Sequence, residues 1–279
     1  MQTGSLFVTP DWVIEHLNDD NLVVLDASMQ QVVGRPPIEY ERPAFLLCAV
    51  AFDLENSFVD PSSNLPHTLP SPERFTQLAQ QLGINEDSHI VIYDNQGIYS
   101  SPRAWWMFKV MGHRKVSIML GGLPAWLEKG YPTQMQPSVV SELGDFRAQL
   151  QPQWICSFEQ VLQSIDDEST YIIDARASAR FLGQAPEPRP GLRSGHIPSA
   201  LNLPFLDIMK GDGYDSPENL TQAFKDLGVT PDQRLIFSCG SGITACILLV
   251  AALQVGYENL AVYDGSWAEW GANQNLPIE

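Results

Sequence analysis

One cysteine lies in a sequence that could stabilise a negatively charged sulfur. Between the apolar run 235–237 and the next helix pattern, the sequence reads Ser238-Cys239-Gly240-Ser241-Gly242-Ile243-Thr244-Ala245. Cys239 is therefore expected at the carboxyl end of a strand, just before a helix N-terminus. Gly240 and Gly242 allow the backbone to curl so that successive amides point at one anion, and the helix N-terminus adds partial positive charge. The hydroxyls of Ser241 and Thr244 can add further donors.

This environment selects among the reactions that a cysteine can perform. Inward amides and a helix N-terminus favour the thiolate over the thiol, and they would equally favour a persulfide, whose charge lies one atom further out. Cysteine phosphatases hold phosphate in a Cys-x5-Arg loop, in which the arginine pairs with the oxyanion. Here the sixth residue after Cys239 is Ala245. The loop therefore suits a small, weakly charged atom such as sulfur better than phosphate.

The other cysteines are expected to be structural. Cys48 and Cys246 lie in apolar stretches, and burial in the core is the simpler interpretation of these two and of Cys156. The cysteines form no CxxC pair and show no zinc-like spacing with histidine. Four of them in 279 residues do not make a disulfide framework. We expect the chemistry to need no metal and no organic cofactor.

The chain contains a similar unit twice. Residues 72–77 and 217–222 are identical at four of six positions, and further matches keep the same separation of 145 residues. This separation places Asp94 where the second copy has Cys239, and an aspartate cannot carry sulfur. We therefore expect a catalytically silent domain at 1–135, a proline-containing linker at 136–153 and a catalytic domain at 154–279.

Short apolar runs alternate with helical patterns along both copies. The runs are continuous and do not alternate with polar residues, which is typical of parallel strands buried on both faces. We expect strands at 22–25, 90–93, 116–120, 171–173, 235–237 and 260–263, and helices at 73–82, 102–111, 218–227 and 244–255. This order predicts an α/β fold in which each domain is a parallel sheet flanked by helices. Ligands in such folds bind beyond the carboxyl ends of the strands.

Composition limits the possible partners. The formal net charge is -17, so long-range repulsion argues against nucleic acid. The longest apolar run lies near 247–253 and is too short to span a bilayer, so no membrane partner is expected. The first ten residues show no basic region followed by an apolar core, which favours a cytoplasmic protein. An anionic substrate would need a local cluster of cations.

These features resemble the rhodanese superfamily, and in particular its two-domain 3-mercaptopyruvate sulfurtransferase branch. Residues 239–245 resemble that branch's CGSGVTA or CGSGITA loop, where thiosulfate-using rhodaneses typically carry CRKGVT. Supporting matches lie at 101–106, 195–198 and 263–267. The resemblance implies two tandem rhodanese-like domains. It also implies that sulfur moves from 3-mercaptopyruvate, with release of pyruvate, through a Cys239 persulfide to a thiol, a thioredoxin-like dithiol or cyanide.

The resemblance also implies substrate-binding residues. In similar enzymes two arginines grip the substrate carboxylate, and they correspond to Arg180 and Arg189. Arginine forks match a carboxylate in geometry, and a strongly acidic chain needs such a clamp for an anionic donor. His67 matches a histidine that relatives present toward the cleft, where it could assist proton transfer. A structural or surface role for His67 is an equal alternative.

Other residues near the motifs are given structural roles. Arg176 and Arg193 are expected to be surface ion-pair partners, and His196 is expected to stabilise a turn. The first domain departs from relatives at 44–49, where they usually carry a segment like residues 195–200. The fine structure of the first domain is therefore less well specified than that of the second.

Two alternatives keep the fold and change the function. A thiosulfate sulfurtransferase would accept a dianion, which would prefer cationic residues where the loop has Gly240 and Ser241. A non-catalytic sulfur carrier would hold a persulfide without turnover, and Asp94 shows that one copy has no nucleophile. The intact loop at Cys239 argues against the second alternative.

Overall fold

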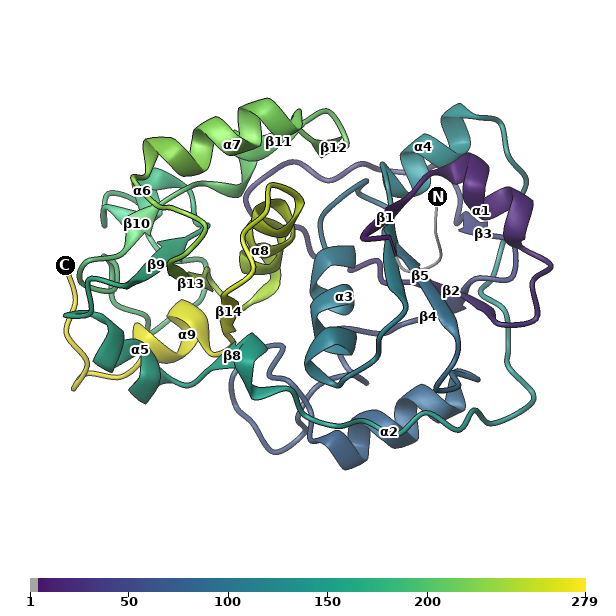
Figure 1. Ribbon diagram of the computed structural model, residues 1–279, viewed down its shortest axis with the longest axis horizontal. Coiled ribbons are helices and arrows are strands. Elements are labelled where there is room, and N and C mark those ends of the chain that lie inside the picture. The colour runs from purple at the N-terminus through teal and green to yellow at the C-terminus, as the bar shows by residue number, and fades with distance from the viewer. Residues whose placement is uncertain (1–4) are drawn as a thin grey trace. The chain divides into compact units, whose positions relative to one another are not determined.

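The computed structural model describes residues 5–279, and the chain forms two compact units (Figure 1). The first unit comprises Met1–Pro61 and Leu69–Gln151, and the second comprises Ser62–Thr68 and Pro152–Glu279. Residues 1–4, which begin the predicted first domain, lie outside the described residues. The short segment Ser62–Thr68 clusters with the second unit although it lies within the sequence of the first.

The first unit is built on a parallel five-stranded sheet in the order β1-β6-β5-β2-β4, with a separate antiparallel pair, β3-β7. Helices α1 and α4 pack on one face of the sheet, and α2 and α3 pack on the other. In chain order the elements are β1 (Phe7–Val8), α1 (Pro10–His16), β2 (Leu22–Asp26), β3 (Phe45–Leu46), β4 (Val50–Ala51), α2 (Pro72–Gln81), β5 (His89–Tyr93), α3 (Ser101–Val110), β6 (Val116–Met119), α4 (Gly122–Glu128) and β7 (Thr133–Gln134).

The second unit repeats this topology, with a parallel sheet in the order β10-β9-β13-β14-β8. Helices α5 and α9 cover one face, and α7 and α8 cover the other (Figure 1). Its elements are η1 (Pro152–Trp154), β8 (Ile155–Cys156), α5 (Phe158–Ser164), β9 (Thr170–Asp174), α6 (Ser178–Phe181), β10 (Leu201–Asn202), η2 (Phe205–Ile208), β11 (Met209–Lys210), β12 (Gly213–Tyr214), α7 (Pro217–Asp226), β13 (Arg234–Ser238), α8 (Ile243–Gln254), β14 (Leu260–Tyr263) and α9 (Ser266–Trp270). The predicted fold class, two parallel sheets flanked by helices, is confirmed.

The repeat is visible in how equivalent helices begin. The Ser71 hydroxyl caps α2 by accepting from the Arg74 amide at 3.3 Å, and the Ser216 hydroxyl caps α7 by accepting from the Asn219 amide at 3.3 Å. A proline follows each cap, where its fixed φ favours the first helical turn. The predicted strands and helices all form, each within one residue of its expected ends. The edge strands β1, β4, β8 and β10 were not expected because they are only two residues long.

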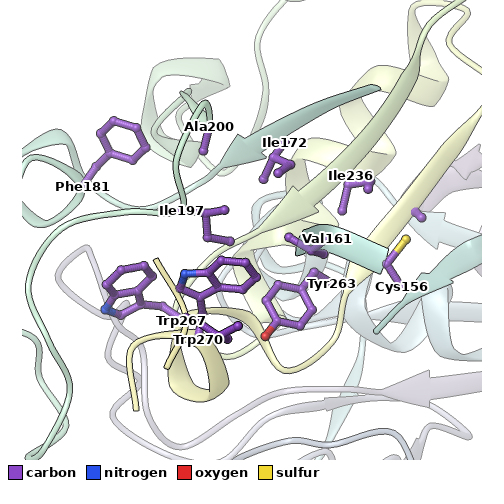
Figure 2. Close-up of a cluster of buried hydrophobic side chains, with 12 residues drawn as sticks. Cys156, Val161, Ile172, Phe181, Ile197, Ala200, Ile236, Tyr263, Trp267 and Trp270 are labelled. Carbon is purple, nitrogen blue, oxygen red and sulfur yellow. The ribbon is translucent and has the colours of Figure 1, made fainter. Parts of the chain in front are cut away.

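Aromatic side chains anchor α9 to the second sheet (Figure 2). Trp267 and Trp270 are fully buried, and the Trp270 ring meets the edge of Tyr263 with centroids 6.2 Å apart. Ile236 from β13 belongs to the same cluster. Since β13 leads directly into the Cys239 loop, this packing fixes α9 relative to that loop.

The segment 135–151, which holds most of the predicted linker, contains no helix or strand and packs along the first unit. The Phe146 amide donates to the Ile84 carbonyl at 3.1 Å. The Phe146 side chain is 1% exposed, and its ring meets the edge of Phe75 with centroids 6.3 Å apart. The segment is therefore part of the first unit's packing. The expected domain bounds stay a prediction.

Of the three cysteines expected to be buried in the core, two are buried. Cys156 and Cys246 are buried, but Cys48 is exposed. Cys48 lies in a turn between β3 and β4, where the Ala49 amide donates to the Leu46 carbonyl at 3.2 Å. This turn gives Cys48 a φ of +60° and points its side chain outward, so the apolar stretch around it is not continuously buried.

No helix within residues 5–279 has the length and apolar character needed to cross a bilayer. The most apolar helix described, α8, has 12 residues. The cytoplasmic location stays a prediction.

Replacing Phe146 with alanine is expected to lower the free energy of unfolding by about 3–5 kcal/mol, because it opens a cavity in an aromatic core. Leu143→Ala is the matched control, since Leu143 lies in the same segment and is 76% exposed. Its effect should stay within about 0.5 kcal/mol. Urea unfolding followed by circular dichroism measures both. Equally small effects would contradict the assignment of this segment to the first unit's core.

Candidate active site

The Cys239 thiol lies between a buried strand and a buried helix. β13 ends at Ser238 and α8 begins at Ile243. The Gly242 amide donates to Cys239 Sγ at 3.1 Å. Gly242 adopts a left-handed φ of +80°, which a residue with a Cβ tolerates poorly, so glycine suits this position in the loop. The amides of the first turn of α8 have no acceptor within the helix and add positive potential at the same place.

The start of α9 holds this loop from its other side. The Cys239 amide donates to Ser266 Oγ at 3.2 Å, and the Trp267 amide donates to the Cys239 carbonyl at 2.9 Å. The Ala268 amide donates to the Gly240 carbonyl at 3.0 Å. Ser266 is fully buried and has a φ of +48°, which is uncommon for a residue with a side chain. These contacts hold the backbone of the loop at Cys239 and Gly240.

The first unit shows what this loop can bind. Asp94 follows β5 at the position of Cys239, and its side chain is fully buried. Its carboxyl oxygens accept five hydrogen bonds of 2.6–3.0 Å, from the Ser101 hydroxyl and from the amides of Gln96, Tyr99, Ser100 and Ser101. The equivalent amides in the second unit, 145 residues on, are those of Ser241, Thr244, Ala245 and Cys246. The repeated loop can therefore surround an acidic group with amides.

The two predicted substrate arginines lie beside the Cys239 loop. A Cβ added at Gly240 would be 3.2 Å from Arg180 Nη2 and 3.8 Å from Arg189 Nη1. Both guanidinium groups thus approach the loop closely at a residue that has no side chain. Arg189 Nη2 also donates to Ser241 Oγ at 3.4 Å. The second unit therefore brings together the cysteine loop and both arginines.

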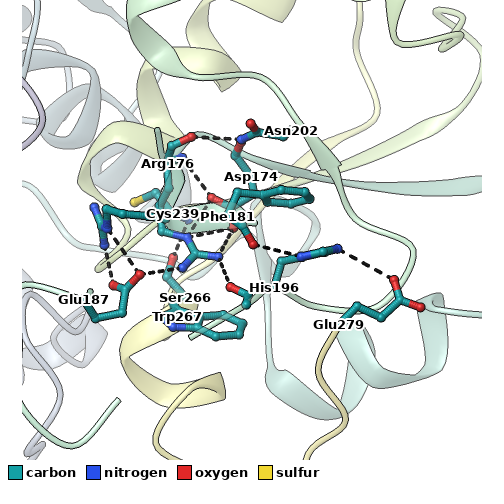
Figure 3. A network of polar contacts seen from close by, with 12 residues as sticks. Asp174, Arg176, Phe181, Glu187, His196, Asn202, Cys239, Ser266, Trp267 and Glu279 are labelled. Carbon is teal, nitrogen blue, oxygen red and sulfur yellow. Dashed lines mark hydrogen bonds and ion pairs between the residues drawn. The ribbon is translucent and has the colours of Figure 1, made fainter. Parts of the chain in front are cut away.

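A buried network of charges holds Arg176 and Arg180 (Figure 3). Arg176 pairs with Asp174 at 2.7 Å through Nη2 and with Glu187 at 2.8 Å through Nη1. Glu187 also accepts from Arg180 Nε at 3.2 Å and Nη2 at 2.5 Å. Burial opposes the charge on Arg176, but the carboxylates of Asp174 and Glu187 outweigh it and raise the Arg176 pKa. Among the described residues Arg189 has no acidic partner, so it adds net positive charge beside the loop.

The expectation that Arg176 and Arg193 are surface ion-pair partners is wrong. Arg176 is paired with acids but is 2% exposed, and its guanidinium lies over the Trp267 ring at 4.3 Å from the centroid. Arg193 is half-buried and donates to main-chain carbonyls, namely those of Trp270, Gly271, Asn273 and Leu276. It therefore ties the end of α9 to the chain that follows, a role that charge pattern alone does not indicate.

The structure places the two histidines singled out in the sequence, His67 and His196, in different surroundings. His196 Nδ1 lies 2.9 Å from the Phe181 carbonyl, and the His196 ring stacks on Phe181 with centroids 3.8 Å apart, as expected of a turn-stabilising residue. His67 has a left-handed φ of +60° and lies in the segment Ser62–Thr68, which clusters with the second unit. His67 thus belongs to the unit that carries Cys239, and its part in proton transfer stays a prediction.

The surroundings of the buried cysteines differ. Cys239 is 2% exposed, so protein surrounds most of its sulfur. Burial raises the pKa of the Cys156 thiol, although Arg234 Nη2 lies 3.2 Å from its Sγ and opposes the shift. Cys246 Sγ donates to the Gly242 carbonyl at 3.2 Å. Neither Cys156 nor Cys246 follows a central strand, so Cys239 is the candidate nucleophile.

The first unit carries a cavity at the equivalent sheet edge. It has a volume of about 610 Å³, and its lining includes Asp26, Ser28 and Asn95. Asp26 and Ser28 stand 148 residues before Asp174 and Arg176, so a serine replaces the buried arginine. Burial raises the Asp26 pKa, while hydrogen bonds from Ser28 oppose the shift. Across residues 5–279, no three His, Cys, Asp or Glu side chains form a group that could hold a metal.

Two carboxylates of this site, Asp174 and Glu187, were not among the site residues predicted from the sequence. Asp174 has a usable signal, since it recurs as Asp26 at the end of the equivalent strand. Glu187 lies between Pro186 and Pro188, a setting that limits the backbone to extended conformations. This stiffness is readable from sequence, but the arginine that Glu187 contacts is not.

The chain resembles known proteins over most of its length. The family described as "Rhodanese-like domain" matches residues 9–129 and 157–273. The chain is 39% identical over 285 residues to the 3-mercaptopyruvate sulfurtransferase of Escherichia coli (strain K12), which covers 98% of this chain and 97% of the relative. It is 36% identical over 301 residues to thiosulfate/3-mercaptopyruvate sulfurtransferase 1, mitochondrial, of Arabidopsis thaliana, covering 100% of this chain and 79% of the relative. The crystal structure of SseA from Escherichia coli, described as a 3-mercaptopyruvate sulfotransferase, matches with a TM-score of 0.82 at 36% identity, over 94% of this chain and 98% of SseA.

Asp94→Ala is expected to lower the free energy of unfolding by about 3 kcal/mol or more, because several buried amides would lose their acceptor. Asp20→Ala is the control, since Asp20 is exposed, and it should change stability by less than about 0.5 kcal/mol. Urea unfolding of both variants decides the question. If the Asp94 variant is as stable as the control, the carboxyl group does not satisfy the loop.

Proposed function

The chain belongs to the rhodanese family, and we propose that it is a sulfurtransferase that takes sulfur from 3-mercaptopyruvate and carries it as a persulfide on Cys239. The observation that carries the proposal is the hydrogen bond of 3.1 Å from the Gly242 amide to Cys239 Sγ, at the start of α8. Relatives with this activity in their names, aligned over nearly the whole chain, support the reaction class. The arginines beside the loop support a donor that carries a carboxylate.

In the first half-reaction the Cys239 thiolate attacks the sulfur of 3-mercaptopyruvate. A sulfur–sulfur bond forms as the donor's carbon–sulfur bond breaks, and the electrons of the broken bond leave on carbon as the enolate of pyruvate. A proton from solvent or a nearby acid then converts the enolate to pyruvate. The product on the protein is a Cys239 persulfide, so this is covalent catalysis.

The protein's part is to hold two negative charges in place. Amides of the loop and of the first turn of α8, from Gly240 to Thr244, stabilise the anionic sulfur. Arg180 and Arg189 lie beside Gly240 and orient the donor's carboxylate. The Asp94 loop of the first unit supports this interpretation, because the amides equivalent to those of Ser241 and Thr244 donate there to a carboxyl group.

In the second half-reaction an acceptor removes the outer sulfur. A thiol, a thioredoxin-like dithiol or cyanide attacks the terminal sulfur of the persulfide, and the bond to Cys239 Sγ breaks with return of the thiolate. The donor product leaves before the acceptor reacts, so ping-pong kinetics are expected. A small-molecule donor and a thiol acceptor, with no nucleic acid or membrane partner, remain the expected partners. The expected location remains the cytoplasm.

Thiosulfate is the second candidate donor, because the Arabidopsis thaliana relative carries both donors in its name. Thiosulfate is a dianion without a carboxylate. The loop offers Gly240 and Ser241 where a dianion would prefer cationic side chains, and Arg189 is a cation with no acidic partner among the described residues. We therefore expect thiosulfate to be the weaker donor. A non-catalytic sulfur carrier would form the persulfide without turnover.

Cys239→Ser is expected to lower the rate of pyruvate release from 3-mercaptopyruvate by about 1,000-fold or more, because the nucleophile is lost. After incubation with 3-mercaptopyruvate, intact mass spectrometry should show one added sulfur on the wild-type protein and none on this variant. Cys48→Ser is the control, because Cys48 is the exposed cysteine and would be the one to gain sulfur if accessibility alone decided the site. This variant should still gain one sulfur and release pyruvate at the wild-type rate. A normal rate of pyruvate release by Cys239→Ser would refute the proposal.

The specificity constant kcat/KM for 3-mercaptopyruvate is expected to exceed that for thiosulfate by about tenfold or more, which corresponds to about 1.4 kcal/mol of transition-state binding. Steady-state assays with one acceptor and both donors provide the comparison. A preference for thiosulfate would overturn the choice of donor but leave the Cys239 persulfide intact. Persulfide formation without turnover on either donor would favour the carrier alternative.

A further inference from the structure

We propose that Glu187 is a positioning residue that holds Arg180 in the orientation needed to grip the donor's carboxylate. The inference rests on the proposed function, because it concerns how the same site selects a carboxylate donor. Glu187 is the only side chain in the described part of the chain that pairs with Arg180. It therefore controls where that guanidinium lies above Gly240.

The contacts of Arg180 leave one edge of its guanidinium available. Glu187 accepts from Nε at 3.2 Å and from Nη2 at 2.5 Å, so its two oxygens occupy the Nε–Nη2 edge. Within residues 5–279, Nη1 makes no hydrogen bond. The N–H groups of the Nη1–Nη2 edge can thus donate to a second carboxylate in the two-point geometry that arginine favours. Nη2 is also the Arg180 atom closest to Gly240.

Glu187 is itself held rigidly. Its side chain is 2% exposed, and its Oε1 accepts from Arg176 Nη1 at 2.8 Å. Arg176 is fixed in turn by Asp174 and by the Gly195 carbonyl, to which Nη2 donates at 2.9 Å. Arg180 is less buried, with 17% of its side chain exposed. Without Glu187, Arg180 would therefore gain freedom to turn away from the loop.

The same buried network reaches the cysteine loop. The Arg176 guanidinium lies over the Trp267 ring, and the Trp267 amide donates to the Cys239 carbonyl at 2.9 Å. Glu187 also lies two residues before Arg189 on a segment stiffened by prolines. Glu187 is thus placed to fix the distance between the carboxylate grip and the reacting sulfur. It does not contact the sulfur, so its effect should fall on donor binding.

Glu187→Gln provides the test, because glutamine keeps the size of the side chain but cannot accept at both oxygens. We expect KM for 3-mercaptopyruvate to rise about tenfold and kcat to change by less than about threefold. KM for thiosulfate, which has no carboxylate for Arg180 to grip, should change by less than about twofold. Glu218→Gln is the matched control, since Glu218 is exposed at the start of α7, and both donors should be unaffected.

A merely structural role predicts a different result. If Glu187 only stabilises the fold, Glu187→Gln should lower kcat/KM for both donors by the same factor, and that outcome would overturn the proposal. A double-mutant cycle adds a second readout: in an Arg180→Lys background, Glu187→Gln should have little further effect on KM for 3-mercaptopyruvate. Fully additive effects of the two substitutions would also contradict the proposal.

The outcomes separate this inference from the proposed function. If the wild-type protein releases no pyruvate from 3-mercaptopyruvate, the proposed function fails. If the wild type is active but Glu187→Gln leaves KM unchanged, only the positioning role fails. Should Glu187→Gln not yield folded protein, Glu187→Asp keeps the charge beside Arg176 but is one methylene shorter, and the same donor-specific rise in KM is expected. An equal loss on both donors in that variant would again reject the role.

Discussion

The loop that follows the central strand of each sheet, where a buried side chain accepts hydrogen bonding from backbone N–H, is the constraint on which this molecule depends. Buried amides need an acceptor, and leaving one unsatisfied costs about 1–3 kcal/mol. In the first unit the Asp94 carboxyl group accepts from four of them. In the second unit Cys239 stands at this position and accepts from the Gly242 amide. The same position in the repeated loop therefore serves stability in one copy and supports sulfur chemistry in the other.

The charges around the cysteine loop are opposite in sign to the net charge of the chain. The formal net charge of -17 would repel an anionic donor, yet three guanidinium groups gather around the cysteine loop. Two buried carboxylates, Asp174 and Glu187, hold Arg176 and Arg180, and Arg189 has no acidic partner among the residues described. A buried arginine without partners would be strongly destabilising, so this network stabilises the cations beside the loop.

The sequence predicted those parts of the molecule that local patterns determine. The central strands follow from continuous apolar runs, the major helices from helical patterns and the cysteine loop from its paired glycines, all of which act over a few residues. The features that the sequence did not predict depend on contacts between residues far apart in the chain. The burial of Arg176 requires Glu187 and Trp267, the carbonyl contacts of Arg193 require the end of α9, and the exposure of Cys48 requires a turn between two short strands. The family resemblance located Arg180 and Arg189, but only the structure places them beside Gly240.

The central claim is that loop amides stabilise the negative charge on sulfur, and replacing the Gly242 amide with an ester tests it most directly. Glycolic acid at position 242 removes the N–H donor to Cys239 Sγ and keeps every side chain. If the claim is right, the rate of pyruvate release from 3-mercaptopyruvate should fall by about tenfold or more, in a protein that folds normally, as expected for one lost hydrogen bond to a charged group. An ester variant that folds and reacts at the wild-type rate would contradict it.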